Sequence, residues 1–294
     1  MMASNLRMNP LVNPFGQFDA ALAGALEANV QAALQEDVGS GDLTGLLVPT
    51  GRVTAQVIVR EAAVLCGAPW FEAVMHALDA GSVIGWQYAE GDLMRIDSVV
   101  CTIEAPARAL LTAERSALNF LQLLSGVATA TRRHVELVAG TDAVVLDTRK
   151  TLPGLRLAQK YAVRVGGGQN QRLALYDGIL IKENHIAAAG GVTQALAAAD
   201  KLKARVMIQI EVENLEQLQQ ALGAGAKSIL LDNFTLDAMR DAVSLTAHRA
   251  LLEASGGVNF ATLRAIAETG VDRISIGSLT KDIRATDYSL RITG

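Results

Sequence analysis

Short apolar runs recur through the second half of the chain, and each run ends at polar or glycine residues. They are VVLDTRK from Val144, ILIKEN from Ile179, IQIEVE from Ile208, ILLDN from Ile229, LLEASGG from Leu251 and ISIGS from Ile274. Such runs are typical of strands buried on both faces of a parallel sheet, and helically spaced stretches separate them. No GxGxxG motif opens the first of these six repeats, which favours a barrel over a doubly wound sheet. Because the count falls short of eight, we predict an incomplete α/β barrel.

The first half mixes helices with alternating strands. Helical spacing covers residues 18–36 and 69–78. The segments VTAQVIVR from Val53 and MRIDSVVCTIE from Met94 approximate the period of two expected for half-buried antiparallel strands. This pattern predicts an α+β domain whose strands form one sheet.

The two patterns meet at a long helix predicted from Thr112 to about Val138. The tail YSLRI from Tyr288 alternates again, and we expect it to return to the first sheet. We therefore predict a first domain over residues 1–115, joined by 284–294, and a barrel domain over 116–283.

Composition narrows the classes of protein that fit. A net charge of −4 without a long basic run argues against nucleic acid as the main ligand. The four histidines form no HxxxH pattern and the two cysteines no CxxC pattern, which argues against a zinc site and a disulfide framework. The first 17 residues predict an extended or disordered arm, and no signal peptide or apolar span of about 18 residues is present. We expect a cytoplasmic protein without a membrane partner.

Charged and polar side chains stand at the ends of the predicted strands. They are Asp147, Arg149, Lys150, Lys182, Glu211, Asp232 and Ser255. Ligands of parallel α/β folds bind where the carboxyl ends of strands converge, so these residues predict an active site. The cations Arg156, Lys160 and Arg164 have helical spacing instead, and we expect them on a solvated helix face.

Arg149 and Lys150 directly follow a strand. An arginine beside a lysine suits a planar carboxylate or a phosphate. A lysine at a strand end is also where a Schiff-base aldolase places its nucleophile. An ion pair with Asp147 is a plainer alternative, and the sequence leaves all three open.

Glu211 and Asp232 end neighbouring predicted strands, so their carboxylates are expected in the same mouth. Paired carboxylates hold Mg²⁺ or stabilise a developing cation, and Mg²⁺ is the metal that these hard ligands favour. They also serve as acid and base, or as partners of Lys150 or Lys182 in salt bridges.

Glycines follow the last two predicted strands, in SGG from Ser255 and GS from Gly277. Backbone N–H groups exposed there favour a phosphate site, which barrels often build at their final two loops. Arg115 falls in the first turn of the predicted long helix, where a cation opposes the helix dipole. It therefore pairs with Glu114 or serves a ligand.

At these residues the chain resembles the quinolinate phosphoribosyltransferase family over nearly its full length. The matching segments are EDVGSGDLT from Glu36, ERSALNFLQ from Glu114, DTRKTLPGLR from Asp147, GGGQNQR from Gly166, LIKENH from Leu180, EVE from Glu211, LDN from Leu231, EASGG from Glu253 and GSLT from Gly277. The resemblance implies an N-terminal open-faced β-sandwich and an incomplete TIM-like barrel. It also implies a homodimer, or a higher assembly, in which the first domain of one subunit caps the barrel of its partner.

The reaction implied by this resemblance converts quinolinate and phosphoribosyl pyrophosphate into nicotinate mononucleotide, pyrophosphate and CO₂, with Mg²⁺, in NAD biosynthesis. The implied catalytic residues are Lys150, Glu211 and Asp232, of which Glu211 and Asp232 also face the metal. The implied substrate-binding residues are Arg115 of the partner subunit, Thr148, Arg149, Lys150, Gln171, Arg172, Lys182, Glu211, Asp232, Ser255, Gly256, Gly257, Ile276, Gly277 and Ser278. Of these, Ser255, Gly256, Gly257, Gly277 and Ser278 would surround the 5′-phosphate.

One position departs from the family pattern. The family usually has histidine before the arginine in its GGGxxHR segment, and this chain has Gln171. Glutamine still donates a hydrogen bond but carries no charge, so we expect binding to survive with altered quinolinate affinity. The alternatives are a phosphoribosyltransferase-like paralogue linked to molybdate transport and a non-catalytic regulator that binds phosphoribosyl pyrophosphate.

Overall fold

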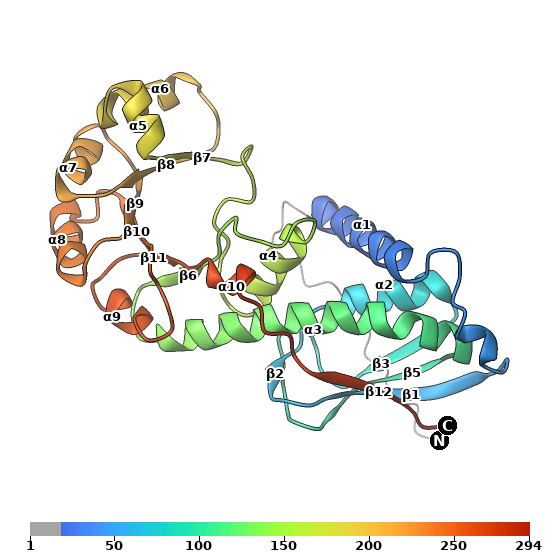
Figure 1. The fold of residues 1–294 in the computed structure, drawn as a ribbon. Coiled ribbons are helices and arrows are strands. Elements are labelled where there is room, and N and C mark those ends of the chain that lie inside the picture. The colour runs from blue at the N-terminus through green and yellow to red at the C-terminus, as the bar shows by residue number, and fades with distance from the viewer. Residues whose placement is uncertain (1–18) are drawn as a thin grey trace. The chain divides into compact units, whose positions relative to one another are not determined.

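The chain folds into two compact units (Figure 1). The structure, a computed structural model, describes residues 19–294, so the arm predicted for the first 17 residues lies outside it. One unit holds the described residues up to Arg132 with Leu152–Gly167 and Asp282–Gly294, and the other holds Arg133–Thr151 and Gly168–Lys281. This division differs from the predicted ranges 1–115 and 116–283, because most of the long helix and residues 152–167 belong to the first unit.

The first unit contains an antiparallel sheet in the order β12-β1-β5-β3. Its strands are β1 (Arg52–Val59), β3 (Val83–Trp86), β5 (Val99–Pro106) and β12 (Tyr288–Ile292), and a separate ribbon pairs β2 (Ala63–Val64) with β4 (Leu93–Met94). The alternating tail therefore joins this sheet as expected. The single strand expected from Met94 is wrong, because a turn with Asp97 at φ 57° separates β4 from β5.

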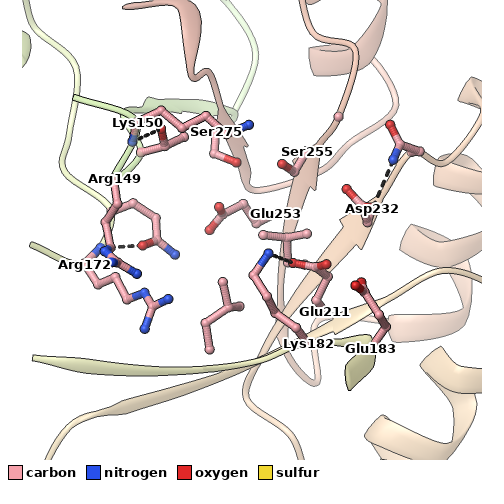
Figure 2. A pocket seen from close by; sticks show the side chains of 16 residues that line it. Arg149, Lys150, Arg172, Lys182, Glu183, Glu211, Asp232, Glu253, Ser255 and Ser275 are labelled. Atoms are coloured by element: carbon pink, nitrogen blue, oxygen red, sulfur yellow. Dashed lines mark hydrogen bonds and ion pairs between the residues drawn. The ribbon is translucent and has the colours of Figure 1, made fainter. Parts of the chain in front are cut away.

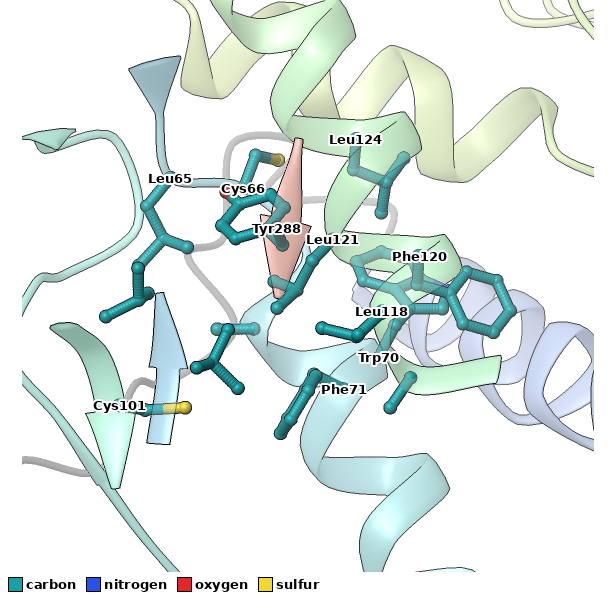
Figure 3. Packing of buried hydrophobic residues seen from close by; sticks show 14 of the residues in the cluster. Leu65, Cys66, Trp70, Phe71, Cys101, Leu118, Phe120, Leu121, Leu124 and Tyr288 are labelled. Carbon is teal, nitrogen blue, oxygen red and sulfur yellow. The ribbon is translucent and has the colours of Figure 1, made fainter. Parts of the chain in front are cut away.

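Helices cover this sheet and enclose the core of the unit (Figure 3). Those that contribute buried residues to the core are α1 (Asp19–Asp37), α2 (Ala68–Leu78), α3 (Ala107–Leu137) and α4 (Arg156–Val165), whereas the short 3₁₀ helix η1 (Gly45–Leu47) leaves its leucines exposed. Alternate residues of β1, namely Ala55, Val57 and Val59, are fully buried against the cluster that includes Trp70 and Phe71. Burying aliphatic and aromatic surface in this way is the main stabilising term of the unit.

Two sequence-based expectations about these helices are wrong. Helix α3 begins at Ala107 rather than near Thr112. The five residues before Thr112 are alanine, arginine and leucine, which favour helix, so the helix extends back to the residue after Pro106. Arg115 therefore lies about two turns inside the helix, where the dipole argument does not apply. On α4, Lys160 is fully buried instead of solvated, because every residue from Ala158 to Val163 is buried.

The second unit is built on a six-stranded parallel sheet in the order β6-β11-β10-β9-β8-β7. The strands are β6 (Val144–Leu146), β7 (Gly178–Ile181), β8 (Met207–Val212), β9 (Ser228–Asp232), β10 (Leu251–Ser255) and β11 (Arg273–Ser275). Within the described residues β6 and β7 are the sheet edges and do not pair with each other. The predicted incomplete barrel is confirmed.

Helices follow the strands of this unit, and all but the short last one lie outside the curved sheet (Figure 1). They are α5 (Glu183–Ala189), α6 (Val192–Lys201), α7 (Leu215–Gly223), α8 (Leu236–Thr246), α9 (Leu263–Ala267) and α10 (Ser278–Lys281). Asn214 and Thr235 cap α7 and α8 by accepting backbone N–H groups of the first turns, so these helices begin where their sequences predict. Across residues 19–294 no helix has the length and apolar character needed to cross a membrane.

Candidate active site

A cavity of about 570 Å³ opens at the carboxyl ends of the barrel strands (Figure 2). Its lining consists of Thr148, Arg149, Lys150, Gln171, Arg172, Leu180, Lys182, Glu183, Glu211, Leu230, Asp232, Asn233, Glu253, Ser255, Gly256 and Ser275. Ten of the predicted site residues are brought together here: Thr148, Arg149, Lys150, Gln171, Arg172, Lys182, Glu211, Asp232, Ser255 and Gly256. Gly257, Ile276, Gly277 and Ser278 are not part of the lining, and Arg115 belongs to the other unit.

The parallel register explains why residues far apart in sequence share this cavity. Ser255 at the end of β10 pairs with Asp232 at the end of β9. Glu211 near the end of β8 pairs with Leu230 of β9. Because successive side chains of a strand alternate between its faces, Leu230 and Asp232 point the same way, into the mouth of the barrel.

Two guanidinium groups form a cationic wall on one side of the cavity (Figure 2). Burial lowers the pKa of Arg172, and the nearby charge of Arg149 lowers it further, while Asp177 opposes both effects. Arg172 Nη1 donates to the Gly178 carbonyl at 3.0 Å, which fixes one end of its fork. The buried Nε of Arg149 has no hydrogen-bond partner within residues 19–294. Two mutually repelling cations beside an unused donor are suited to a planar anion.

The loop after β6 holds Lys150 at the edge of the cavity. Its backbone N–H donates to Thr148 Oγ1 at 3.1 Å, and its carbonyl accepts from Thr280 Oγ1 at 2.8 Å. A Cβ at Gly277 would lie 3.0 Å from Lys150 Cδ. The glycine in the GS pair thus leaves room for the Lys150 side chain, which is a packing role that the sequence did not indicate.

Asp147, fully buried at the end of β6, organises the loop that carries Gln171. Its carboxylate accepts hydrogen bonds from Asn170 Nδ2 at 2.6 Å and from the Gln171 backbone N–H at 2.9 Å. These bonds compensate for burying the carboxylate and set the position of Gln171 beside the cationic wall.

The opposite side of the cavity is acidic (Figure 2). Glu211 is only 7% exposed, and its Oε2 lies 3.4 Å from Lys182 Nζ. Burial raises the pKa of Glu211 and Lys182 lowers it, while the charges of Asp232 and Glu183 raise it again. The salt bridge that sequence analysis left open thus exists, and it leaves Asp232 facing the same space.

Asn233 follows Asp232 in a left-handed conformation, with φ 56°. Its Nδ2 donates to Asp232 Oδ2 at 2.9 Å, and its backbone N–H donates to the Ser255 carbonyl at 2.9 Å. Gly256, at φ 90°, leaves the space that the Asn233 amide occupies. The LDN and SGG segments are therefore in direct contact, and Asn233 orients the carboxylate of Asp232.

Sequence reasoning missed six residues of the lining: Leu180, Glu183, Leu230, Asn233, Glu253 and Ser275. The period of two along each strand was the available signal. Glu253 lies two residues before Ser255 on β10, as Leu230 lies two residues before Asp232 on β9. Residues at such spacing share a face, so they had to point toward the cavity as well.

The fold and the cavity together define a barrel protein whose cavity, at the carboxyl ends of the strands, is suited to anions. The sequence matches the family description "Quinolinate phosphoribosyl transferase, N-terminal domain" over residues 42–125 and "Quinolinate phosphoribosyl transferase, C-terminal domain" over residues 127–291. The chain belongs to the quinolinate phosphoribosyltransferase family.

Named relatives agree with this assignment. The nicotinate-nucleotide pyrophosphorylase [carboxylating] of Mycobacterium leprae is 41% identical over 285 residues, which is 93% of this chain and 98% of the relative. A probable nicotinate-nucleotide pyrophosphorylase of Bacillus subtilis is 39% identical over 260 residues, 88% of this chain and 90% of the relative. The solved structure of the nicotinate-nucleotide pyrophosphorylase from Francisella tularensis aligns with a TM-score of 0.90 at 42% identity, covering 92% of this chain and 96% of that one.

Proposed function

We propose that this protein transfers the phosphoribosyl group of phosphoribosyl pyrophosphate to quinolinate and decarboxylates the product to nicotinate mononucleotide. The observation that carries this proposal is the cavity, in which the Arg149 and Arg172 wall faces the carboxylates of Glu211 and Asp232. The relatives that the chain matches bear the names of this enzyme, and those names do not favour the molybdate-linked paralogue or the non-catalytic regulator.

The cationic wall suits the acceptor substrate. Quinolinate is a planar dianion, and a bidentate guanidinium is the side chain that best matches a carboxylate. Arg149 offers an unused buried Nε, and Gln171 places a side-chain amide beside the wall. Lys150 and Lys182 add positive charge for the pyrophosphate and the other anionic groups.

The acidic side suits the reacting centre of the donor. As the bond from the anomeric carbon to pyrophosphate breaks, positive charge develops on the ribose, and fixed carboxylates stabilise it. Glu211 and Asp232 both line the cavity, which supports this role for them. The ring nitrogen of quinolinate then forms the new bond to the anomeric carbon. The resulting cationic ring takes up the electron pair left when the adjacent carboxylate departs as CO₂, and a proton replaces it on the ring.

Mg²⁺ is part of the proposal, with Glu211 and Asp232 as the protein groups that would hold it. Carboxylate oxygens are ligands that Mg²⁺ prefers. The described residues contain no cluster of three or more His, Cys, Asp or Glu side chains arranged around a metal ion, so substrate oxygens and water would complete its coordination. When bound, the ion would neutralise charge on the leaving pyrophosphate.

The remaining roles extend the same proposal. Ser255 and Gly256 line the cavity, which supports a role for them in binding the 5′-phosphate. Substrate-binding roles for Gly257, Ile276, Gly277 and Ser278 stay predictions. We also propose a cytoplasmic homodimer in which Arg115 of one subunit serves the cavity of its partner.

Product analysis with two acceptors tests this function. Purified protein incubated with phosphoribosyl pyrophosphate and Mg²⁺ is expected to form nicotinate mononucleotide from quinolinate and none from nicotinate. Formation of the nucleotide from nicotinate at a comparable rate would contradict the proposal, as would binding of phosphoribosyl pyrophosphate without any turnover of quinolinate.

A further inference from the structure

Three side chains of the barrel unit form a continuous hydrogen-bonded line, and its two end residues, Gln171 and Glu253, both line the cavity. Gln171 Nε2 donates to Gln209 Oε1 at 2.8 Å, and Gln209 Nε2 donates to Glu253 Oε2 at 2.9 Å. At the other end, Gln171 Oε1 accepts from the backbone N–H of Arg172 at 2.6 Å. Gln209 and Glu253 are each 1% exposed, so little water competes for these bonds.

The bonds all run in one direction, and the carboxylate sets that direction. The NH₂ group of Gln209 faces Glu253, whose Oε2 accepts its hydrogen bond. The Gln209 oxygen must then face Gln171, whose NH₂ group faces it in turn. This leaves the Gln171 oxygen toward the Arg172 N–H. Glu253 therefore determines which way two amides are oriented, although it lies two residues away along the line.

Packing does not account for these polar residues. Leu230 of β9 pairs with Glu253 of β10 on one side and with Glu211 of β8 on the other, and it fills its place in this row with apolar atoms. A buried amide or carboxylate destabilises a fold unless it is hydrogen-bonded, so an apolar pair would serve packing better. Burial also raises the pKa of Glu253, and the bond from Gln209 opposes that shift.

The line ends where the proposed acceptor binds. Arg172 belongs to the cationic wall, and its backbone and Gln171 are tied to the fold by Gln209 on one side and by Asp147 on the other. A planar dianion needs several donors in fixed relative positions, so a small displacement of Gln171 and Arg172 weakens binding without touching the carboxylates opposite.

We propose that Gln209 and Glu253 are positioning residues that hold Gln171 and Arg172 in the geometry required to bind the two carboxylates of the acceptor. This inference rests on the proposed function, because it takes quinolinate as that acceptor. It assigns the two residues to acceptor affinity and not to the transfer step at the ribose.

Substitutions of Gln209 test the inference. Gln209→Met keeps the volume but forms no amide bonds, and Gln209→Asn keeps the amide but is too short to reach both partners. Each is expected to raise KM for quinolinate about tenfold, while kcat and KM for phosphoribosyl pyrophosphate stay within about twofold. Gln220→Met on the exposed face of α7 is the matched control and should leave all three values unchanged. If the methionine variant fails to fold, the asparagine variant still provides the measurement.

Substitutions of Glu253 provide a rescue. Glu253→Leu should raise the same KM, and Glu253→Gln should restore most of the affinity, because its amide oxygen still accepts from Gln209. Calorimetric titration of each variant with quinolinate should reproduce the KM differences. Unchanged quinolinate affinity in folded Gln209 variants overturns the inference, and so does a parallel loss of kcat and of both affinities. Because the unsubstituted protein is assayed first, absence of its own quinolinate turnover identifies a failure of the proposed function instead.

Discussion

Lys182 Nζ lies 3.4 Å from Oε2 of Glu211, so a half-exposed cation sits against a nearly buried carboxylate. The side chain of Lys182 is 49% exposed and that of Glu211 is 8% exposed. Burial raises the pKa of Glu211, and Lys182 is the largest influence that opposes the rise. This pair therefore determines the lowest pH at which the acidic side of the cavity keeps its charge.

Replacing Lys182 by methionine should move the acidic limb of the pH profile upward. Activity that needs ionised Glu211 is lost as pH falls through the pKa of that carboxyl, and removing the cation raises this pKa further. We expect kcat/KM near neutral pH to fall about 100-fold and the acidic limb to shift to higher pH. Lys182→Arg is the control that keeps the charge. An unshifted limb in Lys182→Met would show that Glu211 does not control the profile.

Gly256→Ala should lower the stability of the fold and disturb the acidic side of the cavity. A Cβ there would overlap the Asn233 side chain and lie 3.0 Å from its backbone nitrogen, at a φ of 90°. The expected loss of unfolding free energy is about 3 kcal/mol, and kcat/KM should fall because Asn233 no longer orients Asp232.

Gly257→Ala is the matched control for that substitution. Its φ of 63° imposes strain, but no atom lies within 4 Å of the added Cβ. It should cost only about 1 kcal/mol of unfolding free energy and lower kcat/KM less than Gly256→Ala does, because Asn233 keeps its position beside Asp232. Urea unfolding and steady-state kinetics measure both quantities. Equal effects of the two substitutions would argue against the contact with Asn233.

Gln171→His should change KM for quinolinate more than kcat. The amide of Gln171 bonds to Gln209 and to the Arg172 N–H, and an imidazole cannot repeat both contacts with the same geometry. We expect a change of about fivefold in KM for quinolinate. Steady-state kinetics with each substrate varied in turn measure it, and a large effect on kcat with KM unchanged would contradict this role.

Glu90 should make the stability of the first unit depend on pH. Burial raises its pKa to about 7, although Ala68 N–H and the Tyr161 hydroxyl donate to its carboxyl. The folded state then binds more protons than the unfolded state between the ordinary pKa of glutamate and about 7, so stability falls as pH rises through this window.

Glu90→Gln removes the titrating group and should flatten this dependence. Urea unfolding between about pH 5 and pH 8 measures the slope in both proteins. An identical slope in the two proteins would show that another group is responsible.

The strands of the barrel were predictable because each is a compact apolar run that ends in polar residues. The site residues at those ends, such as Lys182, Glu211 and Asp232, followed from the same rule and converge as the parallel register requires. Polar residues inside the strands could not be predicted to belong to the site by this rule. Gln209 precedes Glu211 by two positions and Glu253 precedes Ser255 by two, and only this alternation with predicted site residues places them on the inner face.

Other misses depended on tertiary context. The helical spacing of Lys160 suggests a solvated face, but α4 packs on more than one side and buries it. The start of α3 was displaced because the residues after Pro106 have high helix propensity and no capping residue marks the boundary. The resemblance to the family identified Arg149 and Arg172, yet the unused Nε of Arg149 is visible only in three dimensions.

The proposed reaction is tested most directly by measuring labelled CO₂ from quinolinate that carries the label in the carboxylate adjacent to the ring nitrogen. With phosphoribosyl pyrophosphate and Mg²⁺ present, the protein should release labelled CO₂ and nicotinate mononucleotide in equal molar amounts, and neither product without phosphoribosyl pyrophosphate. CO₂ release that does not require phosphoribosyl pyrophosphate, or nucleotide that retains the label, would contradict it.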